Sequence, residues 1–380
     1  MLKYSLGLDI ASDKFDACLS AIDDKQDVKV ISSRQFSNKE KGFKLLLDWI
    51  HKNQRDKEIP LVICMEATGV YYEQCALYLF NQGFSVSIIL PNKAKKYLLS
   101  LGLKSKNDTI DAKGLSRMGA EQKLEIWHPM GTFFYLLRGL TRQLQTIQEL
   151  KTMVKNQLHA TELGMYELKF VIKEQKKLIE TYDKLIAKLT IEIEKHLKSN
   201  EAIYAKVKNM ISVKGVGLLT VAVILAETNG FELFKSSSQL VSYCGLDAVE
   251  NQSGSHQGKT RISKKGNSRI RRSLFMPAFC AVKDKDSIFY KLYKRILERS
   301  NIKMKDYVAV QKKLLVIMYT LWKKNEKFNP KNNNSRDEEQ ATSSPLTPQD
   351  KKIVPTKVAL NKVINSVDES QFDSSPCLQS

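Results

Sequence analysis

The chain has 380 residues and carries 61 Lys and Arg against 41 Asp and Glu, a formal net charge of +20. A surplus of this size is self-repulsive unless a polyanion neutralises it, so nucleic acid is the expected partner. No apolar run approaches the ~18 residues of a membrane span, and the first residues lack the basic-then-apolar order of a signal peptide. The six cysteines form no CxxC pair, which argues against a disulfide framework or zinc site and favours a cytoplasmic location.

Residues 1–125 alternate between strand-like and helix-like patterns, which predicts an α/β domain. The strand-like segments are 2–10, 15–22, 28–36, 61–66 and 84–90, and helices are expected at 38–51, from about Val70, and at 92–120 with a break near Asn107. Three strands in succession, followed by strand, helix, strand and helix, is the order of an RNase H-like domain. The pattern also permits other three-layer α/β folds.

Residues 132–200 carry apolar side chains at steps of three and four in two long stretches. These positions are Leu137, Leu140, Leu144, Ile147, Val154 and Leu158, then Ile179, Tyr182, Ile186, Leu189, Ile193 and Leu197. Two long helices with narrow apolar seams, turning near Gly164, predict an antiparallel coiled-coil hairpin that serves as a spacer or oligomerisation element. Two helices of an ordinary bundle are the alternative.

Residues 201–328 predict a second compact domain that is mostly helical, so the fold class is α/β plus all-α. Within this domain, the Gly- and Ser-rich residues 251–258 predict a flexible loop. After Phe328 the composition becomes polar and rich in Asn, Ser and Pro. Residues 329–380 are therefore expected to form a disordered tail.

Four carboxylates occupy strand ends and a helix start in the N-terminal domain. Asp9 and Glu66 end the first and fourth strands, which are neighbours in an RNase H-like sheet. Asp108 and Asp111 are three residues apart and share one face of their helix. Four converging carboxylates repel one another unless a cation lies between them, and hard oxygen ligands select Mg²⁺ or Mn²⁺. Two such ions can activate an attacking hydroxyl and stabilise the leaving oxygen in phosphodiester chemistry.

Each carboxylate also has a plainer interpretation. Asp and Glu are common on surfaces, and Asp108 or Thr109 would serve as a helix N-cap. Asp13, Asp16 and Glu73 are nearby alternatives as ligands, ranked lower because of their positions past the strand end, on the next strand and within a helix.

Basic residues precede the second pair of carboxylates. Lys104 and Lys106 belong to a segment, residues 91–107, that contains no acid. Positive charge there suits the approach of a DNA backbone to an otherwise anionic pocket. A solvated, lysine-rich helix face is the alternative.

The C-terminal domain contains two further candidate nucleic-acid contacts. Lys214, Gly215 and Gly217 form a K-G-V-G turn that resembles a helix-hairpin-helix element, in which backbone N–H groups meet a phosphate; a simple interhelix turn is the alternative. The acid-free segment 255–275 is the denser patch. Its basic residues are Lys259, Arg261, Lys264, Lys265, Arg269, Arg271 and Arg272.

Ser253 lies in the Gly-flanked loop just before this basic patch. A serine there is a candidate nucleophile toward phosphorus. From the residues alone an ordinary loop serine is favoured, since His256 is the only histidine close in sequence and no base is fixed beside it.

Taken together, these segments resemble the DEDD transposases of insertion sequences, the IS one-ten family, and the related Piv DNA invertases. The resemblance spans roughly residues 4–325. The segments that carry it are GLDIASDKFD, MEATGVYYE, KNDTIDAKGLS, GVGLLTVAVILAE, YCGLDAVENQSG and ISKKGNSRIRRSLF.

The resemblance implies a RuvC-like N-terminal domain whose metal ligands are Asp9, Glu66, Asp108 and Asp111. It also implies that Ser253 is the catalytic serine, with Ser255 as a rival, and that the serine forms a covalent intermediate with DNA. The site is then composite, shared between subunits of a dimer or tetramer. A structured bridge RNA would guide the enzyme to donor and target DNA.

Two other functions fit the same residues. A Holliday-junction-type endonuclease needs the four carboxylates but not Ser253. A non-catalytic nucleic-acid-binding protein needs neither. Metal-dependent strand cleavage separates the binder from both enzymes, and a covalent protein–DNA adduct separates transposase from nuclease.

Overall fold

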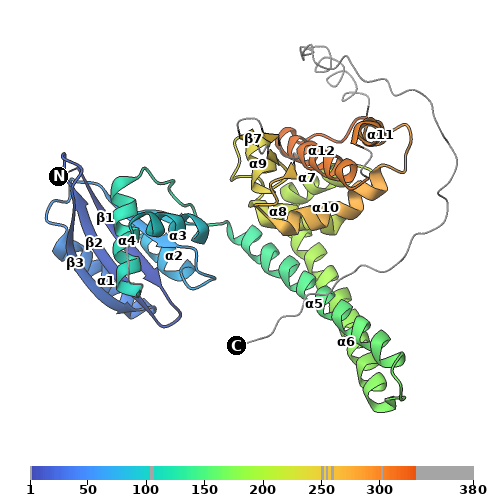
Figure 1. Ribbon diagram of the computed structural model, residues 1–380, viewed down its shortest axis with the longest axis horizontal. Helices are drawn as coiled ribbons and strands as arrows, with labels where there is room; N and C mark the ends of the chain where they lie inside the picture. The colour runs from blue at the N-terminus through green and yellow to red at the C-terminus, as the bar shows by residue number, and fades with distance from the viewer. Residues whose placement is uncertain are drawn as a thin grey trace, which may run out of the picture.

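The computed structural model describes residues 2–330 except 103–106, 250–251, 254–255, 258–260 and 301–302, and only the backbone at 252–253, 256–257, 300 and 303. It has an N-terminal α/β lobe, a helical C-terminal lobe and a long helical hairpin (Figure 1). The predicted tail beyond residue 330 lies outside the described residues. So do three residues of the predicted nucleic-acid surface and the rival serine: Lys104, Lys106, Lys259 and Ser255.

The N-terminal lobe is built on a five-stranded sheet of order β3-β2-β1-β4-β5. Its strands are β1 (Lys3–Ile10), β2 (Lys14–Ile22), β3 (Val28–Ser37), β4 (Leu61–Glu66) and β5 (Ser85–Ile89). β1 pairs antiparallel with β2 but parallel with β4. The predicted neighbourhood of the first and fourth strands is therefore confirmed, and the antiparallel half separates this sheet from the all-parallel doubly wound folds.

Helices cover both faces of this sheet. One face packs against α1 (Glu40–Asn53) and α2 (Glu73–Asn81). The other face packs against α3 (Pro91–Ser100) and α4 (Asp108–Glu121). Alternate side chains of β1 divide between the two faces, because successive residues of a strand point in opposite directions. Leu6 and Leu8 are fully buried in the first core.

The helix α4 lies in direct contact with β1 because Gly7 has no side chain. A Cβ placed on Gly7 would meet the Ala112 carbonyl oxygen at 2.1 Å and the Ser116 nitrogen at 2.2 Å. The Ser116 hydroxyl donates a hydrogen bond to the Ser5 carbonyl oxygen at 2.8 Å. Backbone contact at this point fixes the position of α4 along the strand, and therefore the position of its first turn.

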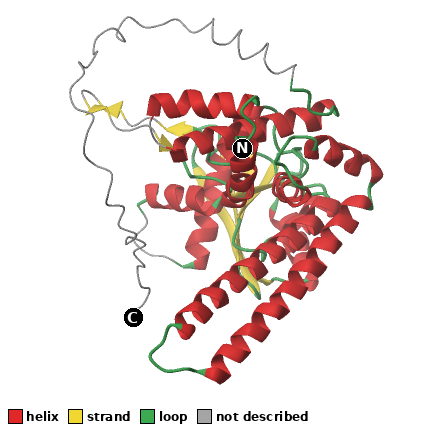
Figure 2. Ribbon diagram, turned by 90° about the vertical axis from the view of Figure 1, so that its right-hand side faces the viewer, coloured by secondary structure: helices red, strands yellow, loops and turns green. Residues whose placement is uncertain are grey.

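The predicted hairpin is present as α5 (Thr132–Glu162) and α6 (Lys169–Lys198), which lie side by side over their length (Figure 2). Its base belongs to the C-terminal core, in which Leu137, Leu144, Ile193 and Leu197 are buried. The far end is exposed, including Met165 and Phe170. The spacer is thus anchored at one end and free at the other.

The C-terminal lobe packs its helices around one apolar core. Its elements are α7 (Glu201–Ile211), α8 (Leu218–Thr228), α9 (Ser237–Tyr243), β6 (Ala248–Val249), β7 (Gln252–Ser253), β8 (His256–Gln257), β9 (Arg261–Ile262), α10 (Ser268–Ala281), α11 (Ile288–Ser300) and α12 (Lys303–Lys324). Four residues of the segment predicted to be a flexible loop, 251–258, form the short strands β7 and β8. β7 and β8 pair antiparallel, with Ser253 opposite His256.

In the part of the chain that the structure describes, no helix is long and apolar enough to cross a membrane. The five described cysteines are free thiols.

The contact between α4 and β1 predicts that Gly7→Ala destabilises the N-terminal lobe. The new methyl group meets backbone atoms that cannot rotate away, so we expect a loss of about 3 kcal/mol in the free energy of unfolding. Urea denaturation measures it. Gly139→Ala, in α5, is the matched control: no atom lies within 4 Å of its Cβ, and we expect a gain of roughly 0.5–1 kcal/mol. Equal stability of the two variants would contradict the close packing of α4.

Candidate active site and nucleic-acid surface

The carboxyl end of β1 opens into a pocket of about 410 Å³ in the N-terminal lobe. Asp9, Asp16 and Asp108 line it, together with Lys14 and Tyr71. Asp9 is placed by β1, and Glu66 is the last residue of the neighbouring strand β4, one position beyond the Leu8–Met65 pair. The sheet therefore brings the first two predicted carboxylates to one edge, as expected from the strand order.

The other two predicted carboxylates come from the first turn of α4. Asp108 begins the helix and Asp111 follows three residues later. Their negative charge is favourable at a helix N-terminus. The N-cap is Asn107, whose Oδ1 accepts a hydrogen bond from the Ile110 nitrogen at 2.8 Å. The plainer interpretation of Asp108 or Thr109 as the N-cap is therefore wrong.

The four predicted carboxylates interact electrostatically. Burial and, after it, the charges of Asp111, Asp108, Glu66 and Asp16 together raise the pKa of Asp9 to about 6. Like charges disfavour ionisation of a neighbouring carboxyl group. The negative field at the end of β1 thus arises from all the predicted ligands and from Asp16.

The carboxylate oxygens at this site are chemically suited to bind a divalent cation. Carboxylate oxygens are the ligands that Mg²⁺ and Mn²⁺ prefer, and a cation would relieve the repulsion around Asp9. Among the described residues, however, no group of three or more His, Cys, Asp or Glu side chains is close enough to hold a metal ion. Of the four predicted carboxylates, Asp9 and Asp108 line the pocket.

Asp16 has a clearer role in the structure than the sequence suggested. It lies directly opposite Asp9 in the β1–β2 pairing and is 9% exposed. Its Oδ1 accepts a hydrogen bond from the Thr109 hydroxyl at 3.0 Å, and its Oδ2 accepts one from the Gln35 amide at 2.9 Å. Like charges directly opposite each other in a sheet are destabilising. Here the Asp16 carboxylate, through its hydrogen bond from Thr109, holds the first turn of α4 beside Asp9. Its place in the second strand was the only sequence signal for it.

The predicted nucleic-acid contacts of the C-terminal lobe divide into free and engaged side chains. Lys264 and Lys265 are exposed, as is Arg261 on β9. Three other basic side chains make internal contacts: Lys214 pairs with Asp284, Arg271 donates to the Cys244 carbonyl oxygen, and Arg272 pairs with Glu149. These internal contacts compete with phosphate.

The K-G-V-G turn joins α7 to α8 and is shaped by its glycines. Gly215 has φ +90°, and a Cβ there would meet the Pro277 carbonyl oxygen of α10 at 3.1 Å. Gly217 is the N-cap of α8. The turn thus packs on α10, which accounts for Gly215 without a ligand.

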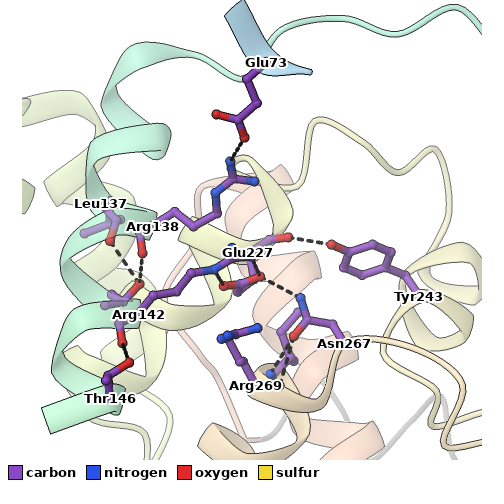
Figure 3. A network of polar contacts seen from close by, with 11 residues as sticks. Glu73, Leu137, Arg138, Arg142, Thr146, Glu227, Tyr243, Asn267 and Arg269 are labelled. Carbon is purple, nitrogen blue, oxygen red and sulfur yellow. Dashed lines mark hydrogen bonds and ion pairs between the residues drawn. The ribbon is translucent and has the colours of Figure 1, made fainter. Parts of the chain in front are cut away.

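A buried carboxylate organises the start of the basic helix α10 (Figure 3). The side chain of Glu227 is 2% exposed and accepts hydrogen bonds from Arg142 at 2.7 and 2.9 Å. It also accepts one at 2.8 Å from Asn267, whose Oδ1 caps α10. Sequence analysis missed this residue, because a single Glu at the end of an apolar helix carries no motif of its own.

The same stretch of α5 contacts the N-terminal lobe. Glu73 accepts a hydrogen bond from the Tyr135 hydroxyl at 2.7 Å and pairs with Arg138 at 3.6 Å. Arg138 and Arg142 are one turn apart on α5, so one helix links the carboxylate lobe to Glu227 (Figure 3). Glu73 therefore has its partners on α5 and does not line the carboxylate pocket.

Ser253 and the carboxylates lie in different lobes. Figure 1 shows β7, which carries Ser253, in the C-terminal lobe, and β1 in the N-terminal lobe. The structure therefore does not bring the predicted nucleophile together with the predicted metal ligands within one chain.

An α/β lobe with a carboxylate pocket, followed by a basic helical lobe, defines a nucleic-acid-processing protein. The family model described as "Transposase", for DEDD enzymes of the IS110 type, matches residues 6–167. The model for the "Transposase IS116/IS110/IS902 family" matches residues 207–294. The chain belongs to this family of insertion-sequence transposases.

Individual relatives agree with the family. The chain is 28% identical to the pilin gene-inverting protein of Moraxella bovis over 329 residues, which cover 86% of this chain and 98% of the relative. It is 22% identical to the transposase for insertion sequence element IS1328 of Yersinia enterocolitica, over 57% of this chain and 69% of the relative. The Thermus thermophilus RuvC structure with a Holliday junction substrate matches 31% of this chain and 93% of that chain at 12% identity. Its TM-score of 0.25 is too low to bear on the fold.

The bond between Thr109 and Asp16 predicts that Thr109→Val impairs strand cleavage. Valine keeps the shape of threonine but cannot donate to the carboxylate, so the first turn of α4 loses its tie to β2. We expect a stability loss of about 1.5 kcal/mol and at least a tenfold slower cleavage, with DNA affinity unchanged. Cleavage rates and urea denaturation measure the two effects. Thr109→Ser keeps the hydroxyl and should restore the rate; a slow Thr109→Ser variant would contradict the role of this hydrogen bond.

Glu227 predicts a pH-dependent contribution to stability. Burial alone would raise the pKa of Glu227, but the hydrogen bonds from Arg142 and Asn267 outweigh it and hold this pKa below its usual value. A lowered folded-state pKa stabilises the protein above the ordinary carboxylate range, and the contribution is lost as pH falls through the folded pKa. Glu227→Gln should cost about 3 kcal/mol at pH 7 and progressively less below about pH 4.5. Urea denaturation across pH measures this, with the exposed Glu149→Gln as a near-neutral control. A deficit independent of pH would contradict the ion pair.

Proposed function

We propose that this transposase cuts and rejoins DNA strands with the carboxylates of its N-terminal lobe and a serine of its C-terminal lobe. The observation that carries the proposal is Asp9, which lines the pocket and whose pKa is raised by burial and by its carboxylate neighbours. Such a perturbed carboxyl group in a pocket is typical of a catalytic centre. Its place within the matched transposase region supports the same conclusion.

Asp9, Glu66, Asp108 and Asp111 would hold a divalent ion, Mg²⁺ or Mn²⁺. When bound, the ion would lower the pKa of an attacking hydroxyl and stabilise the oxygen that leaves phosphorus. The chain itself supplies the acidic pocket and the alignment of α4 against β1, to which Gly7 and Asp16 contribute.

Ser253 would be the nucleophile. Its hydroxyl oxygen forms a bond to phosphorus, the bond from phosphorus to one sugar oxygen breaks, and the hydroxyl proton passes to a base while the leaving oxygen gains a proton. The protein–DNA phosphodiester preserves the bond energy, so attack by a hydroxyl of another strand completes the exchange. A serine hydroxyl needs activation at neutral pH. The placement of Ser253 and the carboxylates in different lobes supports a composite site, shared between subunits of a dimer or tetramer.

Recognition of DNA would depend on phosphate contacts and on a guide. Exposed basic residues such as Lys264 and Lys265 supply sequence-independent affinity. A bridge RNA that pairs with donor and target DNA would supply the sequence specificity. The protein would work in the cytoplasm, and sequencing of co-purified nucleic acid identifies the RNA.

The proposal predicts two separable failures. Asp9→Asn removes a ligand and should abolish cleavage while DNA binding and folding persist, since repulsion at the pocket falls. Ser253→Ala should bind DNA normally and yet form neither a covalent adduct nor recombinant product. Denaturing electrophoresis of trapped adducts, followed by mass spectrometry, locates the modified residue.

The matched control is Ser255→Ala, which should keep near-normal activity. An adduct at Ser255, or one that persists in Ser253→Ala, would reassign the nucleophile. Active protein with no adduct would favour the Holliday-junction-type nuclease, and Asp9→Asn with full recombination would remove the metal site.

A further inference from the structure

The outward face of α10 is unusual for a surface helix. Its inward face packs Ile270, Leu274 and Ala278 into the C-terminal core. The opposite face of an amphipathic helix is normally polar. Here it exposes Phe275 (40%) and Phe279 (40%), with Met276 (59%) between them.

These side chains lie in one row, because residues three and four apart share a helix face. Phe275 and Phe279 are four residues apart, and Lys283 continues the row beyond the end of the helix. The Lys283 ammonium lies 5.6 Å from the centre of the Phe279 ring. We call the row Phe275, Met276, Phe279 and Lys283 the aromatic stripe. It extends for roughly 12 Å, or about three to four nucleotides at ~3.4 Å each.

Aromatic rings continue from the stripe across two further helices. Phe279 contacts Tyr307 of α12 with ring centres 5.5 Å apart, and Tyr307 contacts Tyr293 of α11 at 5.1 Å. Both tyrosines are partly exposed. The rings support one another, so the exposed faces are held in place without a ligand.

The chain segment that follows the stripe and carries Tyr293 and Tyr307 is basic. Residues 282–313 contain ten Lys and Arg against four Asp and Glu. Three of the acids are engaged: Asp284 pairs with Lys214, Glu298 pairs with Lys294, and Asp306 is fully buried. The cores of protein–protein interfaces are enriched in aromatic residues but depleted in lysine. Rings interspersed with cations instead match proteins that bind single-stranded nucleic acid, in which bases stack on aromatic side chains and phosphates meet positive charge.

We propose that the aromatic stripe binds unpaired nucleotides of a single-stranded DNA segment. Phe275 and Phe279 would stack on bases, and Lys283 would contact the backbone. Strand exchange requires DNA strands that are temporarily unpaired, and this surface would hold one of them. The choice of DNA rests on the proposed function, whereas the stripe itself does not.

The experiment measures binding of the full-length protein to a labelled 12-nucleotide oligothymidylate by fluorescence anisotropy at several salt concentrations. Phe275→Ala and Phe279→Ala should each weaken binding on the order of tenfold, with the salt dependence unchanged. Lys283→Ala should also weaken binding, and it should lower the slope of log affinity against log salt by about 0.7. Phe279→Tyr keeps a ring and should bind like the wild type.

Two controls isolate base stacking. Phe170→Ala removes an exposed phenylalanine at the far end of the hairpin and should leave affinity unchanged. An abasic 12-mer has phosphates but no bases, so the wild type should bind it no better than Phe279→Ala does. Circular dichroism should show all variants folded, because both rings of the stripe are substantially exposed.

Several results would overturn the proposal. Wild-type affinity in the Phe275→Ala, Phe279→Ala double variant would remove the stacking role. A lower solution mass of that variant with unchanged DNA affinity would assign the stripe to contacts between copies of the chain. Tighter, stripe-dependent binding of oligouridylate would assign it to RNA. The wild type could also prove inactive in strand cleavage while the double variant loses oligothymidylate binding. That result would support the stripe as a binding surface and contradict only the proposed catalytic function.

Discussion

The absence of a side chain at Gly7 is the constraint on which the N-terminal lobe depends. It allows the backbone of α4 to touch β1, with the Ala112 carbonyl oxygen and the Ser116 nitrogen where a Cβ would otherwise lie. A helix in contact with a strand over its length cannot slide without breaking that packing. The first turn of α4 therefore remains at the end of β1, where its two carboxylates act on Asp9.

This arrangement concentrates negative charge at a cost that the fold must offset. Asp9 faces Asp16 across the β1–β2 pair, with further carboxylates from β4 and α4 nearby. The Asn107 cap, the helix dipole and the Thr109–Asp16 hydrogen bond each stabilise part of that charge. The repulsion that these contacts do not offset contributes to the raised pKa of Asp9. The same concentration of negative charge favours the binding of a cation.

In the C-terminal lobe a single carboxylate has the opposite function. Glu227 is surrounded by donors rather than acids, and its hydrogen bonds connect α5 with the cap of α10. A charged group this deeply buried is tolerated only when its oxygens are satisfied. The result is a defined start for α10, from which the basic residues on one side and the aromatic stripe on another are presented. The contact between Glu73 and α5 joins this lobe to the first.

Periodicity and residue type were sufficient to predict the five strands and the two long helices of the hairpin, because each depends on local pattern. Apolar residues at every second position of a strand, or at every third or fourth position of a helix, indicate which face of the element is buried. The strand order follows from the succession of elements. The pairing of β7 with β8 and the contributions of Asp16 and Glu227 were not predictable in this way. The hydrogen-bond partners of Asp16 and Glu227 are 19 or more residues away in the chain, and such partners come together only when the elements pack. The sequence by itself determined which groups can react, and the tertiary structure decided which of them meet, because convergence is a property of packing and not of spacing along the chain.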